Sequence, residues 1–432
     1  MYNELSKLII YRDLNEESIL YKIAKVIKEV NEKIISIEEA RSAIYAEIKR
    51  LLEISKDYGF NNNLWQSYLT FILISNENSF TMTCEKVGAD NGSVNFFALN
   101  DFKIFKKLFH YDFKQIEEKL GIECFSIITN YKSMVKKDRM YNKNVSLKVE
   151  ELSNKIKNAE NEQQVFDFVT NFYKENGVGV IGLNKAFRIE HNKELELSPI
   201  NNLESIVLDD LIGYEIQKKM LLENTESFIK GKVANNVLLF GDSGTGKSSC
   251  IKAIINQYYH QGLRIVEIYK HQFKDLSSVI AKIKNRNYKF IIYMDDLSFE
   301  EFETEYKYLK AVIEGGIETK PNNVLIYATS NRRHLIRETW NDRNDIDREL
   351  HRSDTMEEKL SLVSRFGITI SFSKPSKKEF DNIVVSLARK YPKIRLSDEE
   401  LIAEANKWQM LHGGISGRTA KQFVNYLLGK IS

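Results

Sequence analysis

Cysteine and proline are both scarce in this sequence. The 432 residues include three cysteines and four prolines. The cysteines, Cys84, Cys124 and Cys250, are odd in number and far apart, which argues against a disulfide framework or a cysteine-based metal site. We therefore expect a reducing, cytoplasmic environment. Because proline is so rare, domain junctions have to be placed from glycines and polar clusters instead.

Long apolar runs are missing as well. The most apolar run, Tyr68 to Ile74, is far shorter than the roughly 20 residues that cross a bilayer. The first residues, MYNELSKLIIYRD, become charged before any long apolar core forms, so we expect neither a signal peptide nor a membrane partner. The 63 basic and 60 acidic residues leave a net charge of only +3, and no global field attracts the chain to nucleic acid.

What the sequence does contain is two halves with different periodicity. Apolar residues from Ile19 to Val30 follow the period of one buried helix face, and similar stretches recur from 37 to 54 and from 102 to 127. Beyond Ser198 to Ser205, short β-rich runs alternate with helical stretches, at 236–240, 263–269, 289–295, 323–329 and 367–372. Such runs indicate buried parallel strands with helical crossovers.

This pattern predicts three domains. We expect a mostly helical N-terminal domain over 1–200, an α/β core over 201–375 with a layout typical of nucleotide binding, and a third region over 376–432. The core is predicted to be a doubly wound, parallel, five-stranded sheet.

The stretch FGDSGTGKSS, from Phe240 to Ser249, supports two incompatible interpretations. Gly-Asp-Ser-Gly surrounds the nucleophile of chymotrypsin-like proteases, whereas the longer frame fits the phosphate-binding pattern G-x-x-x-x-G-K-[ST]. A strand precedes this loop and a helix follows it, so backbone N–H groups and the helix dipole would converge on phosphates. No partner histidine and aspartate are placed for a protease. The predicted nucleotide-binding residues are Gly241, Asp242, Ser243, Gly244, Thr245, Gly246, Lys247, Ser248 and Ser249.

Polar residues follow the next predicted strands. The run FIIYMDD delivers Asp295 to a strand end beside the loop, where it and Ser248 are predicted to hold Mg²⁺. Asp296 is then placed to act as the base that orients the attacking water. Asn331 follows another strand and can contact a γ-phosphate. The alternatives are an ordinary acidic turn and a helix cap.

These motifs together resemble the AAA+ ATPases, and the resemblance implies a P-loop NTPase core of the AAA+ type over 201–375 and a small helical lid over 376–432. The loop, the Asp-Asp strand end, Asn331, SRFG at 364–367 and GISGRTAKQF at 414–423 occur in the order that is typical of that superfamily. The segments LIGYE, DDLSFE, YATSNRRHL and EEKLSLVSRFG look more closely like an uncharacterised bacterial AAA+ family known only as a domain of unknown function. That family is similar to the replication-initiator and helicase-loader branch.

The resemblance implies further site residues. Arg365 would be an arginine finger that reaches a neighbouring subunit, and Arg418 a sensor-two arginine in the lid, although either could form a plain salt bridge instead. Ile212 and Gly213 match a stretch that lines the adenine pocket, or they form a helix-entry turn. Asp-Asp replaces the usual Asp-Glu, and Glu300 is therefore a second candidate for the base.

The predicted activity is ATP hydrolysis with Mg²⁺, coupled to remodelling or loading of a macromolecular partner. The alternative is an ATP-binding switch or scaffold with negligible turnover. No N-K-x-D motif follows the loop, so GTP is not expected. We expect a homo-oligomer with shared sites and a protein client that docks on the N-terminal domain. A basic, aromatic stretch from Tyr131 to Lys148 suits nucleic acid, but a solvated helix end is favoured.

Overall fold

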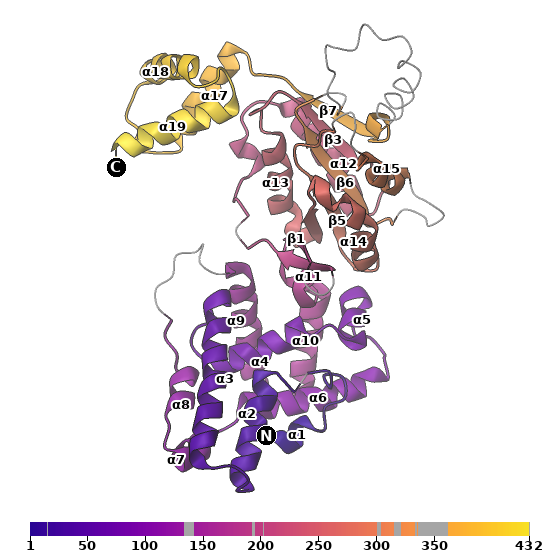
Figure 1. Cartoon of the computed structure of the whole chain (residues 1–432), viewed down its shortest axis with the longest axis vertical. Coiled ribbons are helices and arrows are strands. Elements are labelled where there is room, and N and C mark those ends of the chain that lie inside the picture. Colours follow the sequence, from indigo (N-terminus) through magenta and orange to yellow (C-terminus); the bar gives the residue numbers. More distant parts are fainter. Residues whose placement is uncertain are drawn as a thin grey trace. The chain divides into compact units, whose positions relative to one another are not determined.

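The fold divides into two compact units, Met1–Asn184 and Lys185–Ser432, in the computed structural model (Figure 1). The structure describes residues 1–14, 16–133, 142–191, 195–201, 203–299, 304–314, 321–332, 335 and 362–431. We expected the junction at residues 200 and 201, whereas the boundary between the units lies at residues 184 and 185. It lies earlier because the next segment forms two strands of the C-terminal sheet.

The N-terminal unit is built from helices, and an isolated bridge between Asn62 and Tyr131 is the one β pairing among its described residues. Ser18 caps the predicted helix that begins at Ile19. The residues of its expected face are all buried: Ile19, Ile23, Val26, Ile27 and Val30. Ser36 and Glu39 form a capping box at the next helix, which ends at Gly59 with φ 68°. The helices are α1 (Tyr2–Leu5), α2 (Ile19–Asn31), α3 (Ile37–Tyr58), α4 (Leu64–Ser75), α5 (Ser79–Val87), α6 (Val94–Phe109), α7 (Lys114–Leu120), α8 (Cys124–Thr129), α9 (Lys143–Lys157), α10 (Glu162–Asn176) and α11 (Gly179–Leu183).

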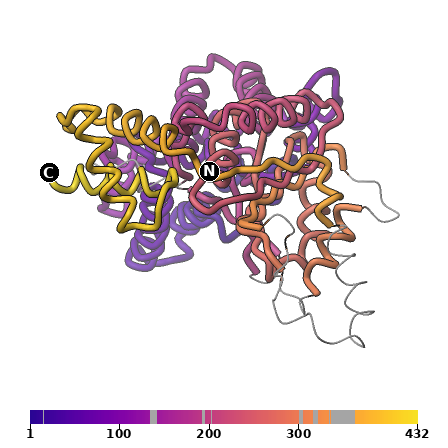
Figure 2. Tube along the Cα trace, turned by 90° about the horizontal axis from the view of Figure 1, so that it is seen from above, coloured from indigo at the N-terminus to yellow at the C-terminus, as the bar shows by residue number. Residues whose placement is uncertain are grey.

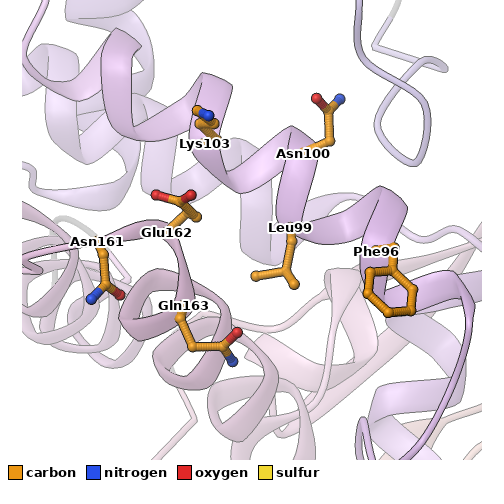
Figure 3. A pocket seen from close by; sticks show the side chains of 7 residues that line it. All are labelled: Phe96, Leu99, Asn100, Lys103, Asn161, Glu162 and Gln163. Atoms are coloured by element: carbon orange, nitrogen blue, oxygen red, sulfur yellow. The ribbon is translucent and has the colours of Figure 1, made fainter.

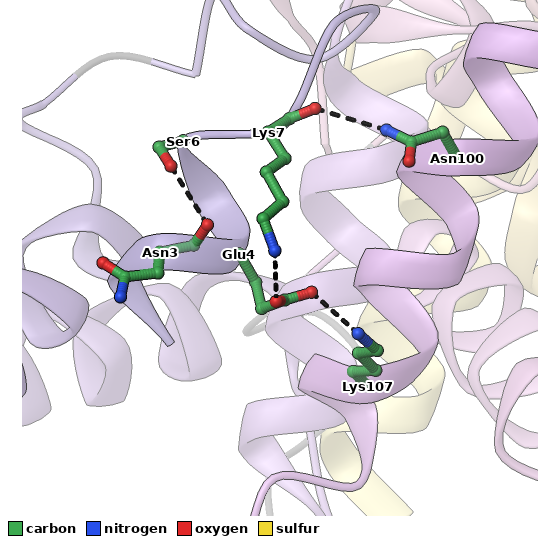
Figure 4. Close-up of polar contacts among 6 residues, drawn as sticks. All are labelled: Asn3, Glu4, Ser6, Lys7, Asn100 and Lys107. Atoms are coloured by element: carbon green, nitrogen blue, oxygen red, sulfur yellow. Dashed lines mark hydrogen bonds and ion pairs between the residues drawn. The ribbon is translucent and has the colours of Figure 1, made fainter.

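Helix α4 lies inside this unit, which explains its apolar run. Nearly all of its residues are buried, and the Trp65 indole N–H donates to the carbonyl oxygen of Leu108 at 2.8 Å. The N-terminal segment is fastened to α6, where the Asp101 carboxylate accepts from the backbone N–H groups of Ile9, Ile10 and Tyr11. Figure 4 shows a second attachment, in which Glu4 contacts Lys7 at 2.8 Å and Lys107 at 2.9 Å.

A pocket lies beside α6 and the start of α10, lined by apolar, amide and charged side chains (Figure 3). The Phe96 ring at its edge is 76% exposed, and its neighbour Phe97 is also exposed. The lining residues are Phe96, Leu99, Asn100, Lys103, Asn161, Glu162 and Gln163.

The C-terminal unit contains a seven-stranded sheet in the order β2-β1-β4-β5-β6-β3-β7. The strands are β1 (Ala186–His191), β2 (Leu195–Pro199), β3 (Val237–Gly241), β4 (Leu263–Glu267), β5 (Lys289–Met294), β6 (Val324–Ser330) and β7 (Ile368–Phe372). The five predicted strands are confirmed as β3 to β7, and they pair in parallel. The hairpin β1–β2, which the sequence analysis did not predict, extends the sheet beside β4.

Helices cover both faces of this sheet, with α13 on one side and α14 and α15 on the other (Figure 1). Alternate residues of the parallel strands, such as Val237 and Leu239, share one hydrophobic core with α12 and α13. The helical elements of the core are η1 (Leu208–Asp210), α12 (Glu215–Ile229), α13 (Lys247–Tyr258), η2 (Tyr259–Gln261), η3 (Lys270–Asp275), α14 (Leu276–Ile283) and α15 (Tyr306–Glu314).

Three further helices lie within 376–432, the range predicted to be a lid, and we call this group the lid: α17 (Lys377–Arg389), α18 (Asp398–Leu411) and α19 (Gly417–Ile431). They have a small hydrophobic core of their own, which includes Phe380, Leu401 and Phe423. Figure 2 shows them as the yellow group that ends at the C-terminus. Within the described part of the chain, no helix combines the length and the apolar character that spanning a membrane requires.

Candidate nucleotide site

The phosphate-loop motif lies between β3 and α13, as the sequence predicts. Gly241 ends the strand with φ 126°, and a Cβ at this position would lie 2.1 Å from the carbonyl oxygen of Phe372 on β7. Only glycine fits such a close backbone approach. The Asp242 N–H donates to the same oxygen at 2.9 Å, and the Asp242 carboxylate accepts from the Lys374 N–H at 2.8 Å. The loop is therefore held against the end of β7.

Lys247 lies beneath this loop and is only 6% exposed. Its ammonium donates to the carbonyl oxygens of Gly241 at 2.9 Å and Asp242 at 2.7 Å, and to Oδ1 of Asn331 at 3.0 Å. Burial lowers the pKa of Lys247 from its ordinary value, against the attraction of nearby aspartates, which raises it. An ammonium that is this desolvated and ringed by acceptors suits contact with a phosphate.

Asp295 follows β5 and accepts hydrogen bonds from two hydroxyl groups. Ser248 Oγ and Thr329 Oγ1 donate to its Oδ1 at 2.7 and 2.6 Å. Burial alone would raise the pKa of Asp295, but the surrounding hydroxyls, Thr329 first, hold the pKa below its ordinary value. Asp295 is therefore a carboxylate at neutral pH, next to the Ser248 hydroxyl with which it is predicted to share a metal ion.

Asp296 and Asn331 meet at the ends of β5 and β6. Asp296 has a left-handed backbone with φ 50°, which is uncommon for any residue other than glycine. Its N–H donates to Thr329 Oγ1 at 2.9 Å, and its carboxylate accepts from Asn331 Nδ2 at 2.7 Å. Asn331 thus bridges Lys247 and Asp296. Glu300, the second candidate for the base, lies outside the described residues.

The lid contacts the loop through the start of α19. The Arg418 N–H donates to the carbonyl oxygen of Gly244 at 3.1 Å. Gly244 has φ 78°, and a Cβ there would lie 3.0 Å from Ser416 Oγ and 3.1 Å from the Arg418 Cβ. Burial is the main cause of the lowered pKa of Lys247, and the Arg418 guanidinium adds to it. The backbone and Cβ of Arg418 therefore lie against the phosphate loop.

The two residues predicted to line the adenine pocket lie where the core meets the lid. Ile212 packs against the lid core, and Gly213 has φ 81° with no atom within 4 Å of a built Cβ. Arg365, the predicted finger, forms an ion pair with Glu314, the last residue of α15 in the same chain. Its side chain is 27% exposed. Its action on a neighbouring subunit stays a prediction.

The residues present fit a nucleoside triphosphate with Mg²⁺. Within the described ranges, no protein acceptor pairs with the N–H groups of Ser243, Gly244 or Gly246, and α13 begins directly after them. Unpaired N–H groups at a helix start, with a lysine beside them, form an anion cradle. No group of three or more histidine, cysteine or acidic residues suitable for a metal occurs among the residues described. A Mg²⁺ ion held by Ser248 and Asp295 would take its other oxygens from phosphate and water.

Sequence reasoning missed two residues of this site. Thr329 links Asp295 to Asp296. Its position near the end of β6, next to the two acidic residues that follow the neighbouring strand β5, could have identified it. Ser416 lies next to Gly244 of the loop, and its hydroxyl is hydrogen-bonded to the Thr419 hydroxyl at 2.9 Å. No local sequence pattern could have shown that contact, because it joins two distant segments.

The parallel strand order, with a phosphate-loop motif between β3 and α13, defines a doubly wound α/β module. The chain belongs to the family described as "Protein of unknown function (DUF815)", whose model matches residues 183–431. No curated protein matches the chain. Among solved structures, it is similar to the Holliday junction branch migration motor RuvB of Thermotoga maritima, with 18% identity and a TM-score of 0.32 over 52% of this chain and 73% of that chain. Two variants of that RuvB give 17% identity, a TM-score of 0.33 and the same coverage.

Proposed function

We propose that the protein hydrolyses ATP with Mg²⁺ and uses the cycle to remodel or load a macromolecular partner. The observation that carries this proposal is the chain of contacts from Lys247 through Asn331 to Asp296, with Asp295 and Ser248 beside it. The contacts link the lysine beneath the phosphate loop to a carboxylate that can orient a water molecule and accept its proton. A site that only held phosphate would not need that link.

Each residue has a definable part in the reaction. Ser248 and Asp295 would hold Mg²⁺, which neutralises charge on the phosphate oxygens when it is bound. Asp296 orients a water molecule and accepts its proton as the new bond to the γ-phosphorus forms and the bond to the bridging oxygen breaks. Asn331 fixes the direction of the Asp296 carboxylate.

The two arginines have complementary parts. Arg418 is proposed to contact the γ-phosphate from the lid. Arg365 is proposed to reach the site of a neighbouring subunit, because an always-charged guanidinium stabilises phosphoryl oxygens in the transition state. The proposal therefore includes a homo-oligomer with shared sites.

A second candidate is a nucleotide-binding switch or scaffold with negligible turnover. The ion pair between Arg365 and Glu314 favours it, because an arginine paired within its own chain is not free to complete another site. Steady-state phosphate release by the purified protein separates the two functions. Hydrolysis that is lost in Asp295→Ala supports the ATPase, whereas ATP binding with no release above that variant supports the switch.

The shared site has its own test. Arg365→Ala should retain ATP affinity but lose hydrolysis by about 10³-fold, the contribution of other arginine fingers. Mixing it with Lys247→Ala subunits creates interfaces with one intact loop and one intact finger, so partial activity should return. Specific activity that stays constant over a wide dilution series, with no recovery on mixing, would exclude a shared site.

The N-terminal unit is our proposed docking site for a protein client, since it has a core of its own and exposes Phe96 and Phe97 beside a pocket. Nucleic acid remains less favoured. Residues 134–141 of the basic stretch 131–148 lie outside the described residues. ATP rather than GTP and a cytoplasmic location complete the proposal. Affinity capture with an ATP-trapped Asp296→Asn variant would identify the client, and an empty capture with verified ATP loading would argue against stable docking.

A further inference from the structure

The segment 203–214 connects the sheet hairpin to α12 and contacts both the core and the lid. Leu211 packs against the core shared by the sheet and α13, and the next residue, Ile212, packs against the lid core. The Leu211 carbonyl oxygen accepts from the Lys218 ammonium at 2.8 Å. Adjacent residues of one segment thus belong to two different hydrophobic cores.

Glu204 lies near the start of this segment and pairs with lysines on two helices. One of its carboxylate oxygens lies 3.1 Å from the Lys252 ammonium on α13, and the other lies 3.8 Å from the Lys421 ammonium on α19. Its backbone is fixed as well, because Asn256 Nδ2 on α13 donates to the Glu204 carbonyl oxygen at 2.7 Å. The carboxylate therefore bridges a core helix and a lid helix from a position tied to the core.

These two helices are the ones whose first residues meet at the phosphate loop. Lys247 begins α13, and the Arg418 N–H at the start of α19 bonds to Gly244. Lys421 lies three residues beyond Arg418, so both lie on one side of α19, about one turn apart. The bridge through Glu204 thus crosses between the helices close to the site, and its lid end is one turn from Arg418.

A second ion pair repeats this connection further along the segment. Asp210, in η1, pairs with Lys390 directly after α17. The Asp210 carboxylate also accepts from the Val207 N–H at 3.0 Å, which fixes its own position. Two acidic residues of one segment therefore each hold a lysine of the lid.

We propose that Glu204 is a positioning residue that holds α19 against α13 and so keeps Arg418 over the phosphate loop, with Asp210 supporting the same placement at α17. The inference rests on the proposed function of Arg418. Because the lid is held by charges on a segment of the core, the ability to distinguish ATP from ADP would depend on those charges.

The expected effect is moderate. The Lys421 and Glu204 side chains are 62% and 53% exposed, and ion pairs this exposed typically change an equilibrium by about two- to fivefold. Salt screens such pairs, so the effect should decline from low to high ionic strength. A variant that only damaged packing would not show this salt dependence.

The test compares ATP and ADP dissociation constants for wild type, Lys421→Gln and Lys407→Gln. Lys407 is the matched control, since it loses the same charge from the lid but pairs with Glu404 on its own helix. Lys421→Gln should weaken ATP by about two- to fivefold more than ADP at low salt, Lys421→Arg should restore the ratio, and Lys407→Gln should resemble wild type. Equal ratios in Lys421→Gln and Lys407→Gln would overturn the proposal.

A measurement without nucleotide separates this inference from the proposed function. Spin labels at Lys219→Cys on α12 and Met410→Cys on α18, in a Cys124→Ser background, report the distance between core and lid; the two remaining cysteines are buried. Lys421→Gln should broaden that distance distribution, whereas an unchanged distribution would overturn the proposal. If Lys421→Gln broadens the distribution but the wild-type protein binds no ATP, the proposed function is contradicted. The inference that Glu204 positions the lid would still stand.

Discussion

Replacing Gly244 by alanine tests the contact between the phosphate loop and the lid. Gly244 has φ 78°, and a left-handed backbone costs an ordinary residue about 1–2 kcal/mol. The lower entropy of the unfolded alanine chain offsets about 0.4–1 kcal/mol of this. Backbone strain alone therefore lowers the melting temperature by about 2–4 °C per kcal/mol of net destabilisation in a unit of this size.

The new methyl group adds a second effect that is specific to this position. It would lie 3.0 Å from Ser416 Oγ and 3.1 Å from the Arg418 Cβ, so these atoms at the start of α19 have to give by a few tenths of an ångström. Overpacking of this kind costs about 1–3 kcal/mol. If nucleotide binding needs the lid in this position, even the lower figure corresponds to an about fivefold loss of affinity. Because Arg418 is displaced, the loss should be greater for ATP than for ADP.

Gly231→Ala is the matched control. Gly231 has φ 73°, and no atom lies within 4 Å of a Cβ built there, so the control carries the same strain without a new contact. Thermal melts and titrations with both nucleotides, on both variants, separate strain from displacement. If Gly244→Ala melts like Gly231→Ala and binds ATP and ADP like wild type, the loop and α19 do not touch as described.

Three further predictions concern single side chains. Arg418→Ala should weaken ATP more than ADP, because only ATP has a γ-phosphate; equal losses in a titration would make Arg418 structural. Thr329→Val should raise the pKa of Asp295 and weaken the Mg²⁺ dependence of ATP binding, because a 2.6 Å hydrogen bond to the carboxylate is lost; an unchanged Mg²⁺ titration would refute this. Lys7 and then Lys107 lower the pKa of Glu4 to about 2, so its stabilisation is present above the ordinary value of 4.5 and is lost as the pH falls through about 2. The small difference in melting temperature between wild type and Glu4→Gln should therefore vanish in strong acid, and a difference that persists there would contradict the pairing.

The parallel strands could be predicted from sequence because they are buried on both faces. Runs such as 236–240 and 289–295 are apolar at consecutive positions, and the observed β3 and β5 begin and end within one residue of them. The helical faces of α2 and α3 were equally clear from their period. The stretch 102–127 was predicted as helical, and the structure divides it among the end of α6, α7 and α8, with Gly121 at φ 60° ending α7.

The hairpin β1–β2 was not predicted, and the reason is physical. Phe187 and Ile189 alternate with polar residues, which is a strand pattern, but β2 is short and only partly buried. Its pairing with β1 is visible only once β4 provides the sheet edge beside them. Local sequence holds little information about such an edge.

The site divides in the same way. The loop residues, Asp295, Asp296 and Asn331 could be predicted because each lies in or directly after a strand whose place in the sheet follows from its neighbours. The contacts of Gly244 with Ser416, and of Glu204 with Lys421, join segments that are distant in the chain. They depend on how the lid packs, and no periodicity encodes that.

The central claim is that the loop from Gly241 to Ser248 binds ATP through Lys247. Equilibrium titration of wild type and Lys247→Ala with a fluorescent ATP analogue, with and without Mg²⁺, tests it most directly. A thermal melt of each protein verifies that both are folded. We predict that wild type binds more tightly with Mg²⁺ and that folded Lys247→Ala does not bind measurably, because the ammonium that contacts phosphate is gone. Equal, Mg²⁺-independent binding by both proteins would contradict the account.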